Sequence, residues 1–327
     1  MLYIIFIFAF LFQIVSNKPI PEKENYRFIQ SHSYEITIKI QGTGIQSILA
    51  SDYYLCPDEV YRGTSRIYTE SDCHLVNIPS GYGEINSLRL VWTTTANSFY
   101  NMFHDLRHIL EVDLSKYDTS AINDMHQIFN NCSSITSINL FNLKTSLVTT
   151  MRLMFGGCSS LTTFDVSSFD TSQITDMHFM FAQVKVKSLN ITHFNTSKVV
   201  NMEGVFANMN ELEHLYLNFD TSKVTNMYAM FFDCPRLTSL DITMFDTSLV
   251  TNMHVMFYNC VYLRSLDIRN FRTENVIYMN GMFQYCKSIT SLDLSNFRTP
   301  NVVDMNNMFR DNYNLASLDV SHFDTSK

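Results

Sequence analysis

The sequence has little glycine and no cluster of basic residues, and each absence excludes a class of function. Only 9 of the 327 residues are glycine, and no glycine-rich phosphate loop occurs. The formal net charge is −8, with 23 Lys and Arg against 31 Asp and Glu, which argues against a nucleic-acid surface. No set of nucleophile, base and orienting residue recurs either. We therefore expect no enzymatic activity, no cofactor and no metal site.

Long apolar runs are scarce as well. The one run covers residues 2–15 and is too short to span a bilayer comfortably, which takes about 20 residues. It is typical of a secretory signal peptide cleaved near Ser16 or Asn17, although no Lys or Arg precedes it. We expect residues 1–17 to be a signal peptide and the protein to be secreted or displayed at the cell surface. An uncleaved anchor is the alternative.

The main feature that is present is an internal repeat. The Phe of a Met-Phe pair recurs every 26 residues, apart from two steps of 25, and the Thr of an Asp-Thr-Ser motif recurs in register with it. One unit reads L-x-x-L-D-L-S-x-F-D-T-S-x-V-T-N-M-x-x-M-F-x-x-C-x-x, and there are about nine units. The repeated phenylalanines are Phe103, Phe129, Phe155, Phe181, Phe206, Phe231, Phe257, Phe283 and Phe309.

Each unit combines two apolar periods. In LTSLDIT, Leu240 and Ile242 alternate with Asp241, as in a short strand with one buried side. In VTNMYAMFFDC, residues 224–234, the apolar positions are spaced by three or four, which predicts one face of a short helix. A single unit cannot bury these residues, so the units must stack. We expect residues 98–327 to form an α/β solenoid, a curved leucine-rich-repeat-type stack with parallel strands on its concave side and helices on its convex side.

The repeat resembles that of the BspA-like surface proteins, a leucine-rich-repeat family with a 26-residue, DUF285-type unit. The segment SLDIRNFRTENVIYMNGMFQYC, residues 265–286, and its eight sister units carry the resemblance. The resemblance implies an extracellular or surface-attached adhesin that recognises protein or glycoprotein ligands, and it brings no catalytic residues. The chain has no sorting motif or lipobox, so the mode of attachment stays open.

The chain changes character on both sides of the repeats. Residues 25–97 contain alternating segments such as YEITIKI and NSLRLVW, with turn signals between them. They predict a small β-rich domain that caps the first repeat; a ligand-binding β domain is the alternative. At the other end the sequence stops inside a unit, with no polar capping repeat. Truncation would account for this, as would pairing of the open end with another molecule.

The seven cysteines fall into two groups. Cys56 and Cys73 stand outside the repeats and could form a disulfide with each other. The other five share one position of the unit, which Val184 and Met209 fill in sister units, so we expect buried free thiols that act as small apolar side chains. These are Cys132, Cys158, Cys234, Cys260 and Cys286. The Asn-x-Ser/Thr triplets that would accept glycans lie at Asn131, Asn190 and Asn195.

Two polar columns run through the repeats. We expect the Thr of each Asp-Thr-Ser motif to bond the backbone at the turn after the strand. A carboxylate column lies on the predicted strands. Its members are Asp113, Asp165, Asp241, Asp267, Asp293 and Asp319. Calcium requires six to eight ligands from several directions, so we expect solvated carboxylates, screened by Arg264 and Arg269.

The repeat is least regular in its middle, and this irregularity suggests a binding surface. Two units there are one residue short, and their strand carries large polar side chains in place of small ones. The residues predicted to bind a ligand on the concave strand face are Glu213, His214, Tyr216, Asp241, Arg264, Asp267 and Arg269. Tyr and Arg commonly anchor protein interfaces, so we expect an extracellular protein or glycoprotein partner. The alternatives are neutral variation at these positions and a structural coat or spacer protein that associates with itself through the ends of the stack.

Overall fold

A computed structural model describes residues 34–67, 72–80 and 83–326. The chain divides into two units, Met1–His32 and Ser33–Lys327, and all described residues belong to the second. The predicted signal peptide lies outside them. The described part contains strands, turns and loops but no α-helix. Accordingly, it offers no helix with the length and apolar character needed to cross a membrane.

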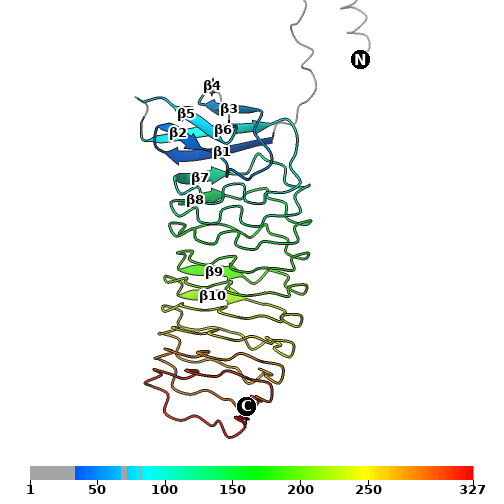
Figure 1. Ribbon diagram of the computed structural model, residues 1–327, viewed down its shortest axis with the longest axis vertical. Helices are drawn as coiled ribbons and strands as arrows, with labels where there is room; N and C mark the ends of the chain where they lie inside the picture. The colour runs from blue at the N-terminus through cyan, green and yellow to red at the C-terminus, as the bar shows by residue number, and fades with distance from the viewer. Residues whose placement is uncertain (1–33, 68–71, 81–82, 327) are drawn as a thin grey trace, which may run out of the picture. The chain divides into compact units, whose positions relative to one another are not determined.

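Six strands form a mixed sheet that joins the N-terminal region to the first repeats (Figure 1). They are β1 (Tyr34–Gln41), β3 (Glu59–Arg62), β4 (Ser65–Ile67), β6 (Ile85–Trp92), β7 (Ile109–Asp113) and β8 (Ser137–Asn139), in the order β4-β3-β6-β1-β7-β8. Strand β1 is antiparallel to both β6 and β7, whereas β7 and β8 are parallel. A separate antiparallel pair joins β2 (Gly44–Ser47) to β5 (Leu75–Ile78).

The alternating sequence of β1 explains its place in this sheet. Ile36, Ile38 and Ile40 are fully buried, while the residues between them are partly exposed. This is the period of two that a strand with one buried face requires. Because β7 and β8 belong to the first repeats, the sheet runs across the predicted boundary at residue 98.

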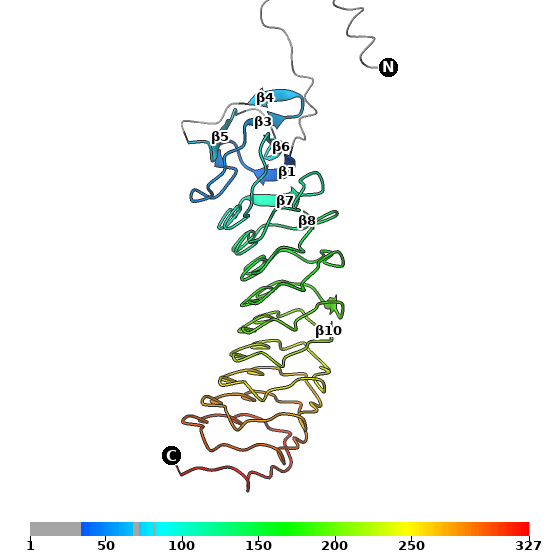
Figure 2. The ribbon, with the colours of Figure 1, turned by 90° about the vertical axis from the view of Figure 1, so that its right-hand side faces the viewer.

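The repeats stack directly on one another (Figure 2). An isolated parallel bridge joins one residue of each unit to its equivalent in the next unit. The bridged residues are Ser98, Asp124, Thr150, Asp176, Asn201, Asn226, Asn252, Tyr278 and Asp304. Within the later units, only β9 (Ser188–Ile191) and β10 (His214–Leu217) extend into a pair of parallel strands.

The prediction of an α/β solenoid with convex helices is wrong. Residues 227–234, where the helix was expected, form consecutive tight turns. The N–H groups of alternate residues donate to carbonyls of the next unit, as from Ala229 to His254 (3.0 Å) and from Phe231 to Met256 (2.9 Å). The N–H of Met230, between them, donates to the carbonyl of Met227 three residues earlier (3.3 Å). A helix would instead use carbonyls four residues earlier in the same segment.

Two positions in each unit have a left-handed backbone, and this excludes the helix. Ala229 has a φ of 53° and Asp233 a φ of 55°, whereas an α-helix needs a negative φ throughout. The second of these positions is occupied mainly by Asn, Asp or Gly, which tolerate positive φ best. Its members are Asp105, Asn131, Gly157, Gln183, Asn208, Asp233, Asn259, Tyr285 and Asp311. This column is the signal in the sequence that separates turns from a helix.

Overlapping four-residue turns, which begin at every second residue, bury the same apolar positions that a helix would bury. Met227, Met230, Phe231 and Cys234 are all completely buried. The repeated phenylalanines stack on one another with ring centroids 5.5–6.1 Å apart. Strands stack about 4.8 Å apart, whereas packed helices would need about 8–10 Å. This difference in spacing was the reason to expect a concave strand side, and without helices it is absent. The surface that carries the strands is therefore called the strand face below.

The Thr column clamps each unit to the next, which confirms its predicted structural role. The hydroxyl of Thr247 donates to the carbonyl of Arg272 (2.8 Å) and accepts the N–H of the same residue (2.7 Å). The equivalent hydroxyls donate in the same way to the following unit. The clamping residues, all of them buried, are Thr119, Thr145, Thr171, Thr196, Thr221, Thr247, Thr273 and Thr299.

The five repeat cysteines are free and buried, as predicted. Each thiol donates to the carbonyl of a phenylalanine in the preceding unit, over 2.9–3.3 Å. Burial raises the pKa of Cys132, Cys234 and Cys286 to about 12. These thiols stay protonated at neutral pH and belong to the core.

Candidate binding surface

Strand β10 presents two aromatic side chains on the strand face. Leu215 points into the core, while His214 and Tyr216 on either side of it are exposed, as the alternation of a strand requires. Their rings lie side by side with centroids 6.5 Å apart, and Tyr216 is 52% exposed. Pairing with β9, which places Tyr216 opposite Asn190, holds the backbone beneath them.

The seven predicted residues come from three successive units. Tyr216, Asp241 and Asp267 hold the same position in those units, and Glu213 and Arg264 share another. The intervening Thr238 bonds the backbone carbonyl of Glu213 through its hydroxyl (3.4 Å). The structure therefore gathers the predicted residues on one face of three adjacent repeats.

Charges on this surface are unevenly paired. The guanidinium of Arg269 donates twice to the carboxylate of Asp267, over 3.0 and 2.7 Å, and lowers the pKa of that carboxyl to about 2. Glu213 lies 3.8 Å from the guanidinium of Arg236. Arg264 is exposed and forms no ion pair with any residue that the structure describes. A ligand can therefore bind Arg264 without breaking an existing ion pair.

The carboxylate column has a structural role that the sequence interpretation missed. The Oδ1 atom of Asp241 accepts the N–H of Thr243 (3.1 Å) and its hydroxyl (2.7 Å), which closes a turn after the strand. These hydrogen bonds lower the pKa of Asp241. The same N–H bond, to the residue two positions on, is made by Asp113, Asn139, Asp165, Asn190, Asp267, Asp293 and Asp319. Turn hydrogen bonds thus stabilise the column, and Arg269 reaches Asp267.

The three glycan-acceptor triplets lie at the surface. Asn131, Asn190 and Asn195 are all exposed. The side-chain oxygen of Asn195 accepts the N–H of Ser197 (3.1 Å) within its own triplet, and Asn190 bonds Thr192 similarly (3.2 Å). Surface exposure satisfies the steric requirement for modification, and the modification itself stays a prediction.

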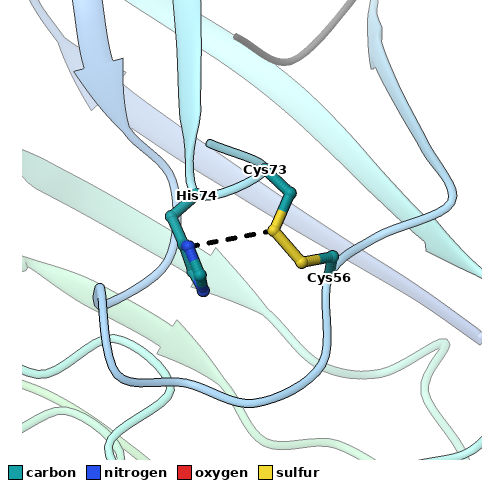
Figure 3. Close-up of side chains that lie close together, drawn as sticks. All are labelled: Cys56, Cys73 and His74. Carbon is teal, nitrogen blue, oxygen red and sulfur yellow. Dashed lines mark hydrogen bonds between the residues drawn. A yellow bond between two sulfur atoms is a disulfide. The ribbon is translucent and has the colours of Figure 1, made fainter. Parts of the chain in front are cut away.

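A disulfide joins Cys56 to Cys73 in the N-terminal region, with His74 beside it (Figure 3). The Nδ1 atom of His74 lies 3.8 Å from the Cys73 sulfur and 2.5 Å from Asp72, and Nε2 lies 2.8 Å from the carbonyl of Tyr53. Burial lowers the pKa of His74, but the hydrogen bonds outweigh burial and raise that pKa overall. Because the sulfurs are bonded to each other, neither is the thiolate that a metal requires.

Comparison with known proteins identifies the repeats. No curated protein and no solved structure matches the chain. A family model described as "Mycoplasma protein of unknown function, DUF285" matches residues 97–188, 177–289 and 262–327. Together these segments cover the whole repeat region and more than half of the chain. The chain therefore belongs to the DUF285 family.

Proposed function

We propose that the protein is a BspA-like recognition module, secreted or displayed at the cell surface, that binds a protein or glycoprotein through its strand face. Membership of the DUF285 family supports the repeat part of this proposal. The signal-like N-terminus and the BspA-like resemblance motivate the extracellular part. Binding would involve shape and many weak contacts, without bond-making chemistry.

The exposed pair His214 and Tyr216 is the observation that carries the proposal. Small polar side chains occupy the equivalent positions in most other units, whereas here two rings stand together on the face that also carries the exposed Arg264, two units further on. Aromatic and Arg side chains dominate the energies of protein interfaces. The hydrogen-bonded strand pair fixes the backbone beneath the rings before binding, which lowers the entropic cost of association.

The test uses the purified chain as bait on extracellular-matrix and cell-surface extracts, followed by measurement of the affinity for each captured ligand. Tyr216→Ala and Arg264→Ala should each weaken binding by roughly tenfold or more, as expected for interface anchors. Tyr313→Ala is the matched control, because Tyr313 is even more exposed and lies four units further on. Equal effects of the Tyr216 and Tyr313 variants would refute this placement of the site. Light scattering that shows concentration-dependent oligomers would favour the coat or spacer function instead.

A further inference from the structure

A groove of about 560 Å³ beside the strand face gathers three arginines. Arg269 and Arg272 come from one unit and Arg298 from the next, and all three are exposed. Two carboxylates, Asp246 and Glu274, line it as well, so the lining carries a net charge of +1 in a chain whose net charge is −8. Such a local concentration of guanidinium groups is suited to an anionic ligand.

Arg272 and Arg298 occupy a position where the unit normally has a structural Asp. In the Asp-Thr-Ser motif, the Asp side chain accepts the N–H two residues on, as Asp246 does from Ser248 (2.9 Å). The equivalent bond recurs in the units that retain Asp. An Arg side chain has no acceptor, so two consecutive units forgo this turn bond and gain a cation each. Lys144 makes the same replacement in an isolated unit, where it pairs with Asp118 (3.1 Å). Only Arg272 and Arg298 make it in neighbouring units, and such a repeated break of a structural rule is typical of a functional site.

The Thr clamps hold these two arginines one repeat apart. The hydroxyl of Thr247 accepts the N–H of Arg272 (2.7 Å). The hydroxyl of Thr273 donates to the carbonyl of Arg298 (2.7 Å) and accepts the N–H of the same residue (2.8 Å). Adjacent strands are about 4.8 Å apart, and like charges at such spacing repel each other unless an opposite charge intervenes. Within residues 34–67, 72–80 and 83–326, neither guanidinium forms an ion pair with a carboxylate. Nη1 of Arg298 already donates to the carbonyls of Ser295 and Phe297 (2.9 and 2.8 Å). An oxyanion between the two arginines would relieve the repulsion and accept hydrogen bonds from Arg272 and from the other N–H groups of Arg298.

The lining of the groove favours a saccharide over a peptide. Asn270 donates to the carbonyl of Thr243 and Asn296 to that of Arg269, each over 2.6 Å. With the Thr clamps, these bonds occupy backbone groups that an added peptide strand would need. Met244, which is 75% exposed, is the exposed large apolar side chain of the lining. No exposed aromatic ring lines the groove, so apolar side chains of a peptide would find little to pack against. The carboxylates of Asp246 and Glu274, which also line it, can accept hydrogen bonds from sugar hydroxyls.

We propose that this groove binds a sulfated polysaccharide, whose sulfate groups bridge Arg272 and Arg298 while its hydroxyls contact the polar rim. Sulfate offers several oxygens to two guanidinium groups at once, as bidentate recognition requires. The inference goes beyond the proposed function and stands without it. It concerns another class of ligand, and it does not depend on His214 or Tyr216.

The test is calorimetric titration of the intact chain with a heparin-derived hexasaccharide at low salt. The same hexasaccharide without sulfate is the ligand control and should not bind. Arg272→Gln and Arg298→Gln should each weaken binding about five- to tenfold, because each removes a charge-assisted contact. Each should also reduce the dependence of log affinity on log salt by about one unit. Arg107→Gln is the matched protein control, since it removes one exposed charge in the first repeat, far from the groove, and it should change the affinity less than about twofold.

Three results would overturn the inference. The first is an absence of binding by the sulfated hexasaccharide at millimolar concentration, and the second is an equal loss in the Arg107 and Arg272 variants. The third is equal binding by a polyglutamate peptide of the same charge, which would point to acidic peptides instead. Tyr216→Ala should leave saccharide binding intact. Its effect on a protein ligand therefore tests the proposed function separately.

Discussion

Replacing Thr247 with Val should loosen the junction between two repeats while preserving the shape of the side chain. The substitution removes a hydroxyl that both donates to and accepts from the backbone of Arg272. Each backbone group left without a partner costs about 1–3 kcal/mol, with the lower end applying at a partly buried site. The added methyl group recovers about 0.8 kcal/mol. We expect a net loss of about 1.2 kcal/mol in the free energy of unfolding.

Two further variants isolate the hydroxyl. Thr247→Ser keeps both hydrogen bonds and loses one methyl group, so it should cost about 0.8 kcal/mol. Thr251→Val removes the hydroxyl of an exposed Thr in the same unit, which makes a single bond to the carbonyl of Thr225 (3.1 Å). It should change stability by less than about 0.5 kcal/mol.

The assay is equilibrium urea unfolding followed by far-ultraviolet circular dichroism, with hydrogen exchange of the Arg272 amide as a local measurement. That amide should exchange faster in Thr247→Val and at the wild-type rate in Thr251→Val. Equal destabilisation by the two Val variants, or unchanged exchange at Arg272, would refute the clamp as a source of stability.

Three other predictions follow from the turns, the thiols and the carboxylates. Gly204→Ala should destabilise the protein by about 2–4 kcal/mol, because Gly204 has a φ of 57° and an added Cβ would overlap the ring of Phe179. Gly281→Ala, at the equivalent position, should cost about half as much, since its nearest obstacle is a Val255 methyl 3.1 Å away; equal urea midpoints would contradict this. The five repeat thiols should resist a thiol-specific chromogenic reagent until urea unfolds the chain, and labelling of the native protein would show that they are not buried. The pKa of Asp267 is lowered from 3.8 to about 2 by Arg269, so the unfolded chain takes up its proton first as the pH falls. Its contribution to stability should be complete above pH 4 and disappear towards pH 2, and Asp267→Asn should flatten acid unfolding in that window.

The register of the repeats and most of the core could be predicted from the sequence. Phe231 and Cys234 recur in register and are buried, and Thr247 bonds the backbone as expected. These predictions succeed because stacked repeats must bury each apolar column and must give each buried hydroxyl a hydrogen-bond partner. Both requirements hold whatever the local backbone conformation.

The backbone between the columns could not be obtained from apolar spacing. Helices and four-residue turns both bury positions three or four apart, so Met227 and Phe231 fit either structure. Asp233 and its Asn, Asp and Gly counterparts carried the distinction, because these residues tolerate the left-handed conformation. The interpretation of Asp241 as a solvated carboxylate missed a comparable signal, namely a hydroxyl residue two positions further on that completes the turn.

The basic groove was missed for a different reason. Attention to the irregular units led to Tyr216, whereas the groove lies where the spacing is regular and only the residue type changes. The relevant signal is the replacement of Asp by Arg at positions 272 and 298 of one column. Lys144 shows the same change of charge in one isolated unit, so the change in two successive units is what marks the groove.

The central structural claim is that the repeats are held together by turns bonded to their neighbours, in place of helices. Scalar couplings across hydrogen bonds, measured by nuclear magnetic resonance on deuterated protein, test it directly. The amides of Ala229, Phe231 and Asp233 should couple to the carbonyls of His254, Met256 and Tyr258 in the next unit. Couplings from these amides to carbonyls four residues earlier in their own unit would establish a helix and contradict the account.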